Sequence, residues 1–197
     1  MTRWFARPAA LVSVAASVAL ASVALAGAVS ALSVTQWSML SGSSKLDFIG
    51  IQAGAAFEGG FDKFTADIRF DPQDLAASRF DVKIDMASVN SRDSERDQII
   101  RGKDLFDVAQ WPVGHYVAEK FLPTGNGRYT ATGALTLLGV TRNVPIRFSF
   151  EEGQDGAWLK GDASIERLTF GIGKGEWSDT SMVGNEVKVR FALHLKP

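Results

Sequence analysis

The sequence predicts an all-β protein, an eight-stranded antiparallel β-barrel that is closed or nearly closed and carries a short helical insert. Apolar and polar residues alternate with a period of two in eight segments after about residue 45. Turn-forming residues separate these segments, and one internal stretch replaces the alternation with helical spacing. Strands with one apolar and one polar face are typical of antiparallel sheets, and closing the sheet removes its exposed edges.

The amino terminus carries a long segment without charge. Arg3 and Arg7 precede residues 9–32, which hold no charged residue and are rich in Ala, Val and Leu. This order is typical of a secretory signal peptide, which we place at residues 1–31. An uncleaved membrane anchor is the alternative, because the apolar stretch is long enough to span a bilayer. Its Ala, Ser and Gly content favours the signal peptide and leaves residues 32–197 as one exported barrel domain.

The strands follow from the alternation. Phe80, Val82, Ile84 and Met86 alternate with charged residues, which puts one apolar face inward and one polar face to water. Pro, Gly, Asn and Asp mark the turns, for example at Asp71-Pro72 and Gly125-Asn126-Gly127. We predict strands at residues 46–51, 64–70, 80–86, 113–121, 129–137, 144–150, 157–165 and 187–195.

The helical insert lies between Ser91 and Val108, where charges crowd together and apolar residues recur at helical spacing. Asp93 or Ser94 is the predicted cap, and the helix is predicted to end near Arg101-Gly102. The polar residues 90–97 have two interpretations. They form either a solvated helix surface or a polar lid whose arginines meet a ligand head group at the barrel mouth.

The barrel interior is predicted to be strongly aromatic, because the chain has 13 Phe and 5 Trp. An eight-stranded barrel is either filled by its own side chains or holds one elongated ligand. Small residues on apolar faces, at Gly54, Ala55, Gly59, Gly60, Gly133 and Ala163, favour free volume. We expect the apolar interior or its mouth to be lined by Phe57, Phe61, Phe64, Phe106, Trp111, Phe170 and Trp177.

Composition argues against several classes of chemistry. The net charge is −1, so no basic field invites nucleic acid. The chain has no Cys, and its two His, His115 and His194, lie far apart in the sequence, so we expect no metal site and no catalytic triad. The glycines of residues 170–177 lack the spacing of a phosphate-binding loop. An enzyme would have to rely on carboxylate pairs, Asp93 with Asp97 or Asp179 with Glu186.

Four groups of residues run in a fixed order between Trp37 and the carboxyl terminus: Phe61–Pro72, Asn90–Pro112, Gly133–Val144 and Arg167–Val187. Together they resemble the YceI-like family of exported bacterial lipid-binding proteins. Two positions depart from the family's pattern: Ile99 stands where many members carry His, and Leu105 where many carry an aromatic residue.

The resemblance implies a lipocalin-like eight-stranded barrel whose pocket holds a long polyisoprenoid, such as an isoprenoid quinone or a polyprenyl phosphate. It implies a periplasmic binding or carrier protein and no enzyme, with no cofactor other than a bound isoprenoid lipid. Arg96, Arg101 and Arg167 are the candidates for the head group, because phosphate or quinone oxygens need donors where the tail ends. For Arg167 the alternative is an ion pair with Asp179 or Glu176.

The leading hypothesis is therefore a carrier or sequestering protein for an amphiphilic isoprenoid. The alternative is a non-catalytic adaptor that docks on a b-type membrane cytochrome in a quinone-linked redox system. This alternative comes from the resemblance, because some relatives are fused to di-haem b-type cytochromes. The sequence leaves open the identity of the lipid and whether the protein forms a homodimer.

Overall fold

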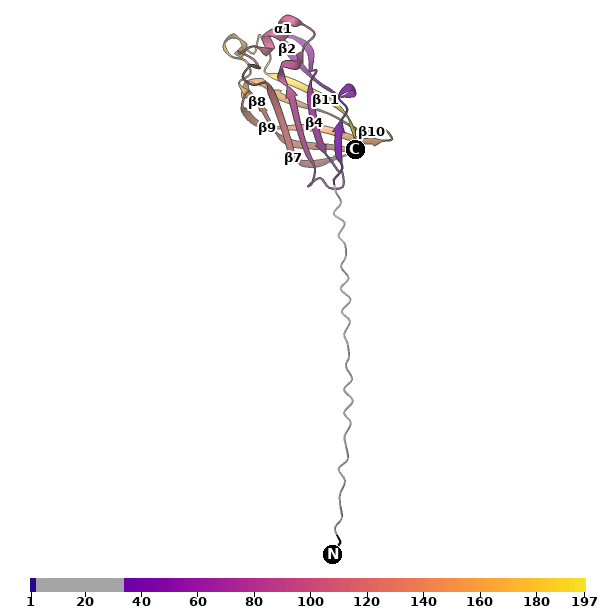
Figure 1. Ribbon diagram of the computed structural model, residues 1–197. Coiled ribbons are helices and arrows are strands. Elements are labelled where there is room, and N and C mark those ends of the chain that lie inside the picture. Colours follow the sequence, from indigo (N-terminus) through magenta and orange to yellow (C-terminus); the bar gives the residue numbers. More distant parts are fainter. Residues whose placement is uncertain (3–33) are drawn as a thin grey trace. The chain divides into compact units, whose positions relative to one another are not determined.

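The computed structural model describes residues 1–2 and 34–197, and residues 34–197 form an antiparallel barrel with α1 at one end (Figure 1). The predicted signal peptide, residues 1–31, lies outside the described residues except for its first two, and it stays a prediction. Within the described ranges, no helix has the length and apolar character needed to cross a membrane.

The sheet closes because β11 pairs with both β10 and β1, and β1 in turn pairs with β4. Three barrel positions are each shared by two short strands that follow one another in the same direction: β1 with β2, β3 with β4, and β5 with β6. Eleven strands therefore occupy eight positions, which confirms the predicted eight-stranded barrel. The strands are β1 Gln36–Met39, β2 Lys45–Gln52, β3 Ala55–Phe61, β4 Phe64–Arg69, β5 Arg79–Asp85, β6 Val89–Asn90, β7 Val113–Gly125, β8 Arg128–Leu137, β9 Val140–Gly153, β10 Gly156–Glu166 and β11 Glu186–Lys196.

Three of these strands, β1, β3 and the two-residue β6, lie outside the eight predicted segments. The sequence of β3 shows little alternation because an inward position holds Gly59, where a side chain would collide with the ring of Phe48 on the paired strand β2. Cross-strand packing, which a linear pattern does not contain, thus replaces the missing apolar side chain.

The insert folds as one α-helix, α1, at Ser94–Arg101. A carboxylate oxygen of Asp93 accepts from the backbone N–H groups of Glu95 and Arg96, each at 3.1 Å, and Gly102 ends the helix. Arg101 joins the helix to the barrel by donating to the carbonyls of Ala87, at 2.9 Å, and Val89, at 2.7 Å. The predicted cap and end of the helix are confirmed, and satisfied terminal groups explain why so short a helix is stable here.

Short 3₁₀ turns connect the other elements. They are η1 Ser41–Ser43 between β1 and β2, η2 Met86–Ser88 between β5 and β6, and η3 Arg167–Phe170 and η4 Gly175–Ser178 between β10 and β11.

The half of the barrel remote from α1 is filled by an aromatic cluster. Phe70 is its centre and is 1% exposed, with five other rings at centroid distances of 4.9 to 5.9 Å. Edge-on contacts of this kind add to the free energy gained from burial. The aromatic cluster closes this half of the barrel and consists of Trp37, Phe70, Phe80, Phe121, Tyr129, Phe148 and Phe150.

An ion-pair network on the outer face of β5 and β7 makes stability depend on pH. A nitrogen of His115 lies 2.7 Å from Asp81, and Arg79 donates to the same carboxylate at 3.0 Å. These hydrogen bonds hold the pKa of Asp81 below its ordinary value of 3.8, and the one from His115 contributes most. Because the pKa is lower in the folded state, the stabilisation is present above the unfolded-state pKa of about 3.9 and is lost as the pH falls through the folded-state value.

We therefore expect Asp81→Asn to lower the free energy of unfolding at pH 7 by less than about 1 kcal/mol, since the carboxylate is partly solvated. The difference from the wild type should shrink as the pH falls below about 3.9, as measured by urea unfolding at pH 7 and at pH 3. Asp155→Asn, in the exposed turn between β9 and β10, is the control. An Asp81→Asn effect of equal size at both pH values would contradict this assignment.

Candidate functional site

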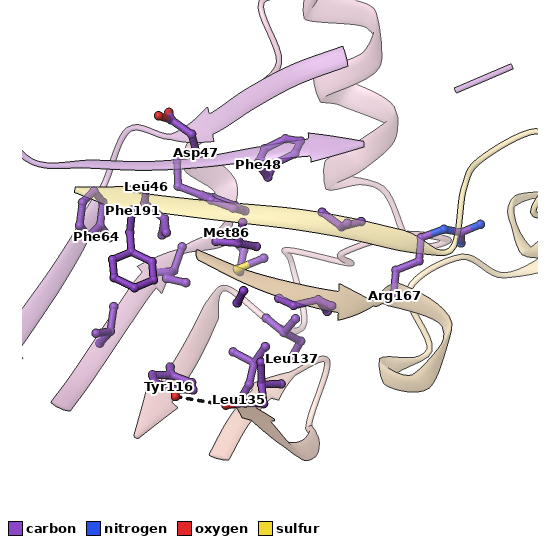
Figure 2. Close-up of a pocket in the computed structure, with 18 of the residues that line it drawn as sticks. Leu46, Asp47, Phe48, Phe64, Met86, Tyr116, Leu135, Leu137, Arg167 and Phe191 are labelled. Atoms are coloured by element: carbon purple, nitrogen blue, oxygen red, sulfur yellow. Dashed lines mark hydrogen bonds between the residues drawn. The ribbon is translucent and has the colours of Figure 1, made fainter. Parts of the chain in front are cut away.

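An apolar cavity of about 220 Å³ occupies the α1 half of the barrel. All its lining residues are apolar or glycine except Asp47, Tyr116 and Arg167. Figure 2 shows the carboxylate of Asp47 and the guanidinium of Arg167 directed away from the apolar side chains. Ile68 and Phe80 line the cavity, and Phe80 also belongs to the aromatic cluster, so that cluster forms the closed end of the cavity.

Four of the seven predicted aromatic residues line this cavity: Phe57 and Phe61 on β3, Phe64 on β4, and Phe106 after α1. The rings of Phe61 and Phe106 lie 6.2 Å apart, which brings the end of β3 and the α1 connection together. All four are partly buried and pack against the core. Their position suits lipid binding, and that role stays a prediction.

The other three predicted residues do not line the cavity. Phe170 is 2% exposed and belongs to the core, and Trp177 is half-buried on η4. Trp111 is 36% exposed and lies against Gly139 in the β8–β9 turn, where a Cβ would approach the indole to 2.6 Å. All three lie in segments between strands, where the alternation rule does not say which way a side chain points.

The small residues create less free volume than the sequence suggested. The space above Gly59 is filled by the ring of Phe48, and the space above Gly133 by the ring of Tyr116, which a Cβ would meet at 2.5 and 2.4 Å. Ala163 does line the cavity. The volume therefore depends on where rings from neighbouring strands lie, and this is decided by register.

Most of the cavity lining is aliphatic and lies outside the predicted set of aromatic pocket residues. The alternation already places these aliphatic residues on the inward face of each strand, as it does for Val82 and Ile84. They include Val82, Ile84, Leu135, Leu137, Val144, Ile146, Val187, Val189 and Leu193. The inward positions of the strands, aromatic or not, are therefore the sequence signal for this lining.

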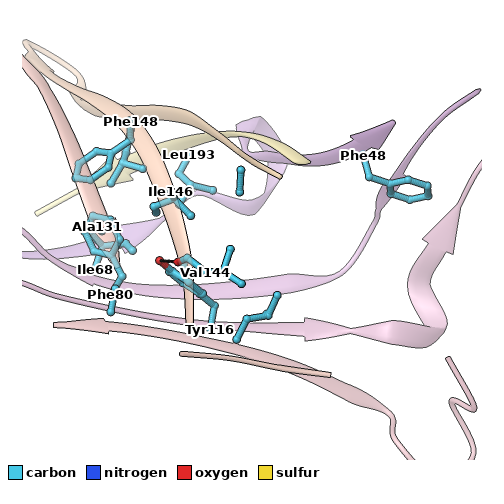
Figure 3. Packing of buried hydrophobic residues seen from close by; sticks show 14 of the residues in the cluster. Phe48, Ile68, Phe80, Tyr116, Ala131, Val144, Ile146, Phe148 and Leu193 are labelled. Atoms are coloured by element: carbon cyan, nitrogen blue, oxygen red, sulfur yellow. Dashed lines mark hydrogen bonds between the residues drawn. The ribbon is translucent and has the colours of Figure 1, made fainter. Parts of the chain in front are cut away.

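Tyr116 contributes the one hydroxyl among the lining residues. Its O–H donates to the carbonyl of Val144 at 3.2 Å, as Figure 3 shows. Burial raises the pKa of Tyr116 above its ordinary value of 10, so the phenol stays neutral. With its hydroxyl satisfied inside the wall, Tyr116 presents an apolar ring to the cavity.

Of the three predicted head-group residues, Arg167 itself lines the cavity, and Arg96 lies next to a lining residue. The guanidinium carbon of Arg96 lies 4.3 Å from the centre of the Phe57 ring, and its Nε donates to Gln52 at 3.0 Å. A second contact, at 3.4 Å, joins it to the capping Asp93. Arg101, as described above, binds two carbonyls of the β6 region.

Arg167 is 3% exposed and donates to three backbone carbonyls, those of Ile172, Val183 and Gly184, at 2.6 to 2.9 Å. Burial lowers the pKa of its guanidinium below the ordinary value, and the carbonyls compensate the buried charge. Its partners are carbonyls and not Asp179 or Glu176, the alternative drawn from the sequence. The assignment of the three arginines to a head group stays a prediction.

The carboxylate pairs that an enzyme would need hold structural roles. Asp93 caps α1, and the backbone N–H of Ser91 donates to Asp97 at 2.8 Å. Asp179 accepts two hydrogen bonds from Ser181, and Glu186 accepts one from Ser164. Hydrogen bonds hold the pKa of Asp93 and of Asp179 below 3.8, the opposite of what a general acid requires.

Comparisons with known proteins agree with this geometry. The YceI-like domain matches residues 37–195. A UPF0312 protein of Vibrio parahaemolyticus is 29% identical, with 71% of this chain and 72% of the relative covered. A UPF0312 protein of Pseudomonas savastanoi pv. phaseolicola is 34% identical, with 68% of this chain and 74% of the relative covered.

Solved structures share the fold. BcnA of Burkholderia cenocepacia is 31% identical with a TM-score of 0.77, over 81% of this chain and 99% of that one. A polyisoprenoid binding domain from Saccharophagus degradans, implicated in plant cell wall breakdown, is 16% identical with a TM-score of 0.63, over 81% and 97%. The barrel, its apolar cavity and the match over residues 37–195 together show that this chain belongs to the family of proteins with a YceI-like domain.

Proposed function

We propose that this protein binds the tail of an amphiphilic polyisoprenoid in the barrel cavity and acts as a carrier or sequestering protein. The observation that carries the proposal is the nearly complete absence of polar lining in a cavity closed at one end by the aromatic cluster. A branched hydrocarbon chain matches such a lining, and each Å² of apolar surface removed from water contributes about 25 cal/mol.

A binding role suits the polar groups near the cavity better than catalysis does. The phenol of Tyr116 is neutral and satisfied, and Arg167 is surrounded by carbonyls. The similarity to a polyisoprenoid binding domain in another organism supports the choice of an isoprenoid over other lipids. Isoprenoid quinones and polyprenyl phosphates both have tails of this chemistry.

The proposal includes a location outside the cytoplasm, in the periplasm. It is supported by the signal-like pattern of residues 1–31, in which two Arg precede an uncharged apolar stretch. A carrier there would shield an isoprenoid tail from water between membranes.

The experiment is native mass spectrometry of the protein purified from the exported fraction, followed by solvent extraction and identification of the released molecule. We expect a bound polyisoprenoid that organic solvent removes. A protein that carries no lipid and also fails to bind added quinones and polyprenyl phosphates would overturn the proposal. Recovery of a b-type cytochrome with such a protein would favour the adaptor alternative.

A further inference from the structure

A second recess, of about 960 Å³, opens on the side of the barrel, and we call it the wall recess. It lies where two ladders stop. Strand β1 pairs with β4 as far as Ser38 opposite Asp67, and β2 pairs with β3 from Asp47 opposite Gly60. Residues 39–46 and 61–66 between these points have no ladder pairing across the two barrel positions. The turn η1 lies in the first of these segments.

The wall recess adjoins the apolar cavity. Leu46, Asp47, Phe61, Phe64 and Ile84 line both spaces, so these residues lie between them. Leu46 and Phe64 are half-buried and lie near each other and near Asp47 in the close-up of the cavity (Figure 2). Small rotations of such side chains would join the two spaces, because side-chain rotamers exchange rapidly.

Four cations line the wall recess: Lys45, Lys63, Lys83 and Arg92. All four are exposed, and none takes part in an ion pair within the part of the chain that the structure describes. They come from separate strands and turns and therefore surround the opening from several sides.

Three carboxylates share the wall recess, and two of them already accept hydrogen bonds. Asp62 accepts from the amide of Asn90 at 3.1 Å, and Asp85 from the backbone N–H of Ala87 at 3.0 Å. Asp47 is the third. The lining of the wall recess therefore has one more cation than carboxylates. The N–H donors of its lysine ammonium groups stay available for a ligand.

The arginines at the α1 end differ in this respect. Arg101 and Arg167 together donate to five backbone carbonyls, and Arg96 bonds Gln52 and Asp93. A head group at those arginines would have to displace protein acceptors, at a cost in stability. A head group at the lysines of the wall recess would replace only water.

We propose that the wall recess binds the anionic phosphate head group of the polyisoprenoid, with Lys45, Lys63 and Lys83 as its donors. This inference rests on the proposed function, since the tail then passes between Leu46 and Phe64 into the cavity. Charge-assisted hydrogen bonds from ammonium groups to phosphate oxygens are among the stronger polar contacts in proteins. The site therefore selects a polyprenyl phosphate over an isoprenoid with an uncharged head.

The test compares a polyprenyl phosphate with the prenyl alcohol of the same chain length. Binding to the full chain is measured by tryptophan fluorescence titration at low and at physiological salt. We expect the wild type to bind the phosphate at least about tenfold more tightly than the alcohol, with a preference that weakens as salt increases. The triple variant Lys45→Gln, Lys63→Gln, Lys83→Gln should bind both ligands equally, at the wild-type affinity for the alcohol.

The matched control is Lys103→Gln, Lys120→Gln, Lys188→Gln, which removes three exposed lysines outside both spaces and should keep the preference. Inorganic phosphate distinguishes a head-group site from a free anion site. It should fail to displace the polyprenyl phosphate at millimolar concentration, because it lacks the tail.

Each other outcome decides against part of the proposal. Equal binding of phosphate and alcohol to the wild type would overturn the head-group site and leave tail binding intact. Retention of the preference in the triple variant, with its loss in Arg96→Gln, would place the head at the α1 end. Displacement by inorganic phosphate would indicate a free anion site, and failure to bind either prenyl compound would overturn the proposed function itself.

Discussion

Replacing Ala163 by Phe is expected to weaken isoprenoid binding at least about 100-fold while the barrel stays folded. Ala163 lies on β10, faces inward and lines the cavity. A phenyl ring there would occupy space that the ligand tail needs in a cavity of about 220 Å³. Displacing one five-carbon isoprene unit forfeits about 4 kcal/mol at about 0.8 kcal/mol per buried carbon, which sets the upper end of the effect.

The matched control is Ser164→Phe, because the next residue of the same strand points to solvent. It loses only the exposed hydrogen bond to Glu186 and should bind as the wild type does. Binding is measured by titration with the isoprenoid identified by extraction, and folding by circular dichroism and urea unfolding. Unchanged affinity in a folded Ala163→Phe protein would show that the ligand lies outside this cavity.

Replacing Phe70 by Ala should have the largest effect on stability, lowering the free energy of unfolding by about 3 to 5 kcal/mol. The ring is 1% exposed and contacts five other rings of the aromatic cluster. Its removal leaves a gap that the surrounding strands cannot close, because barrel hydrogen bonding holds their backbones in place. Urea unfolding followed by tryptophan fluorescence measures the change.

Phe57→Ala provides the comparison within the cavity half. Phe57 is half-buried, lines the cavity and stacks under Arg96, so its removal should cost less than about 2 kcal/mol. Equal destabilisation by the two variants would contradict the division of the barrel into a filled aromatic half and an apolar cavity.

The two halves of the barrel are stabilised by different interactions, and this explains how a chain without Cys can keep an interior cavity. The aromatic cluster concentrates packing at the end remote from α1. The α1 end instead uses hydrogen bonds, through the Asp93 cap and the arginine contacts to carbonyls. The well-packed aromatic half thus offsets the smaller packing energy of the half that contains the cavity.

Local signals were sufficient for part of this structure. The cap at Asp93 and the end at Gly102 depend on hydrogen bonds between residues close in sequence, so a linear pattern reveals them. The alternation at Phe80–Met86 likewise predicts a strand and its inward face. The same rule does not reveal strand β3, because Gly59 occupies an inward position where a larger apolar residue would mark the alternation.

The sequence by itself determined the antiparallel barrel, the capped helix and an apolar interior, because alternation and capping are properties of neighbouring residues. Only the tertiary structure decided which rings fill the interior and which line a cavity. Phe57 and Phe170 look alike in the sequence, yet one lines the cavity and the other lies in the core. The wall recess and the hydrogen bonds of Arg167 likewise depend on register between distant strands. Contacts across a closed barrel join residues that no local pattern links.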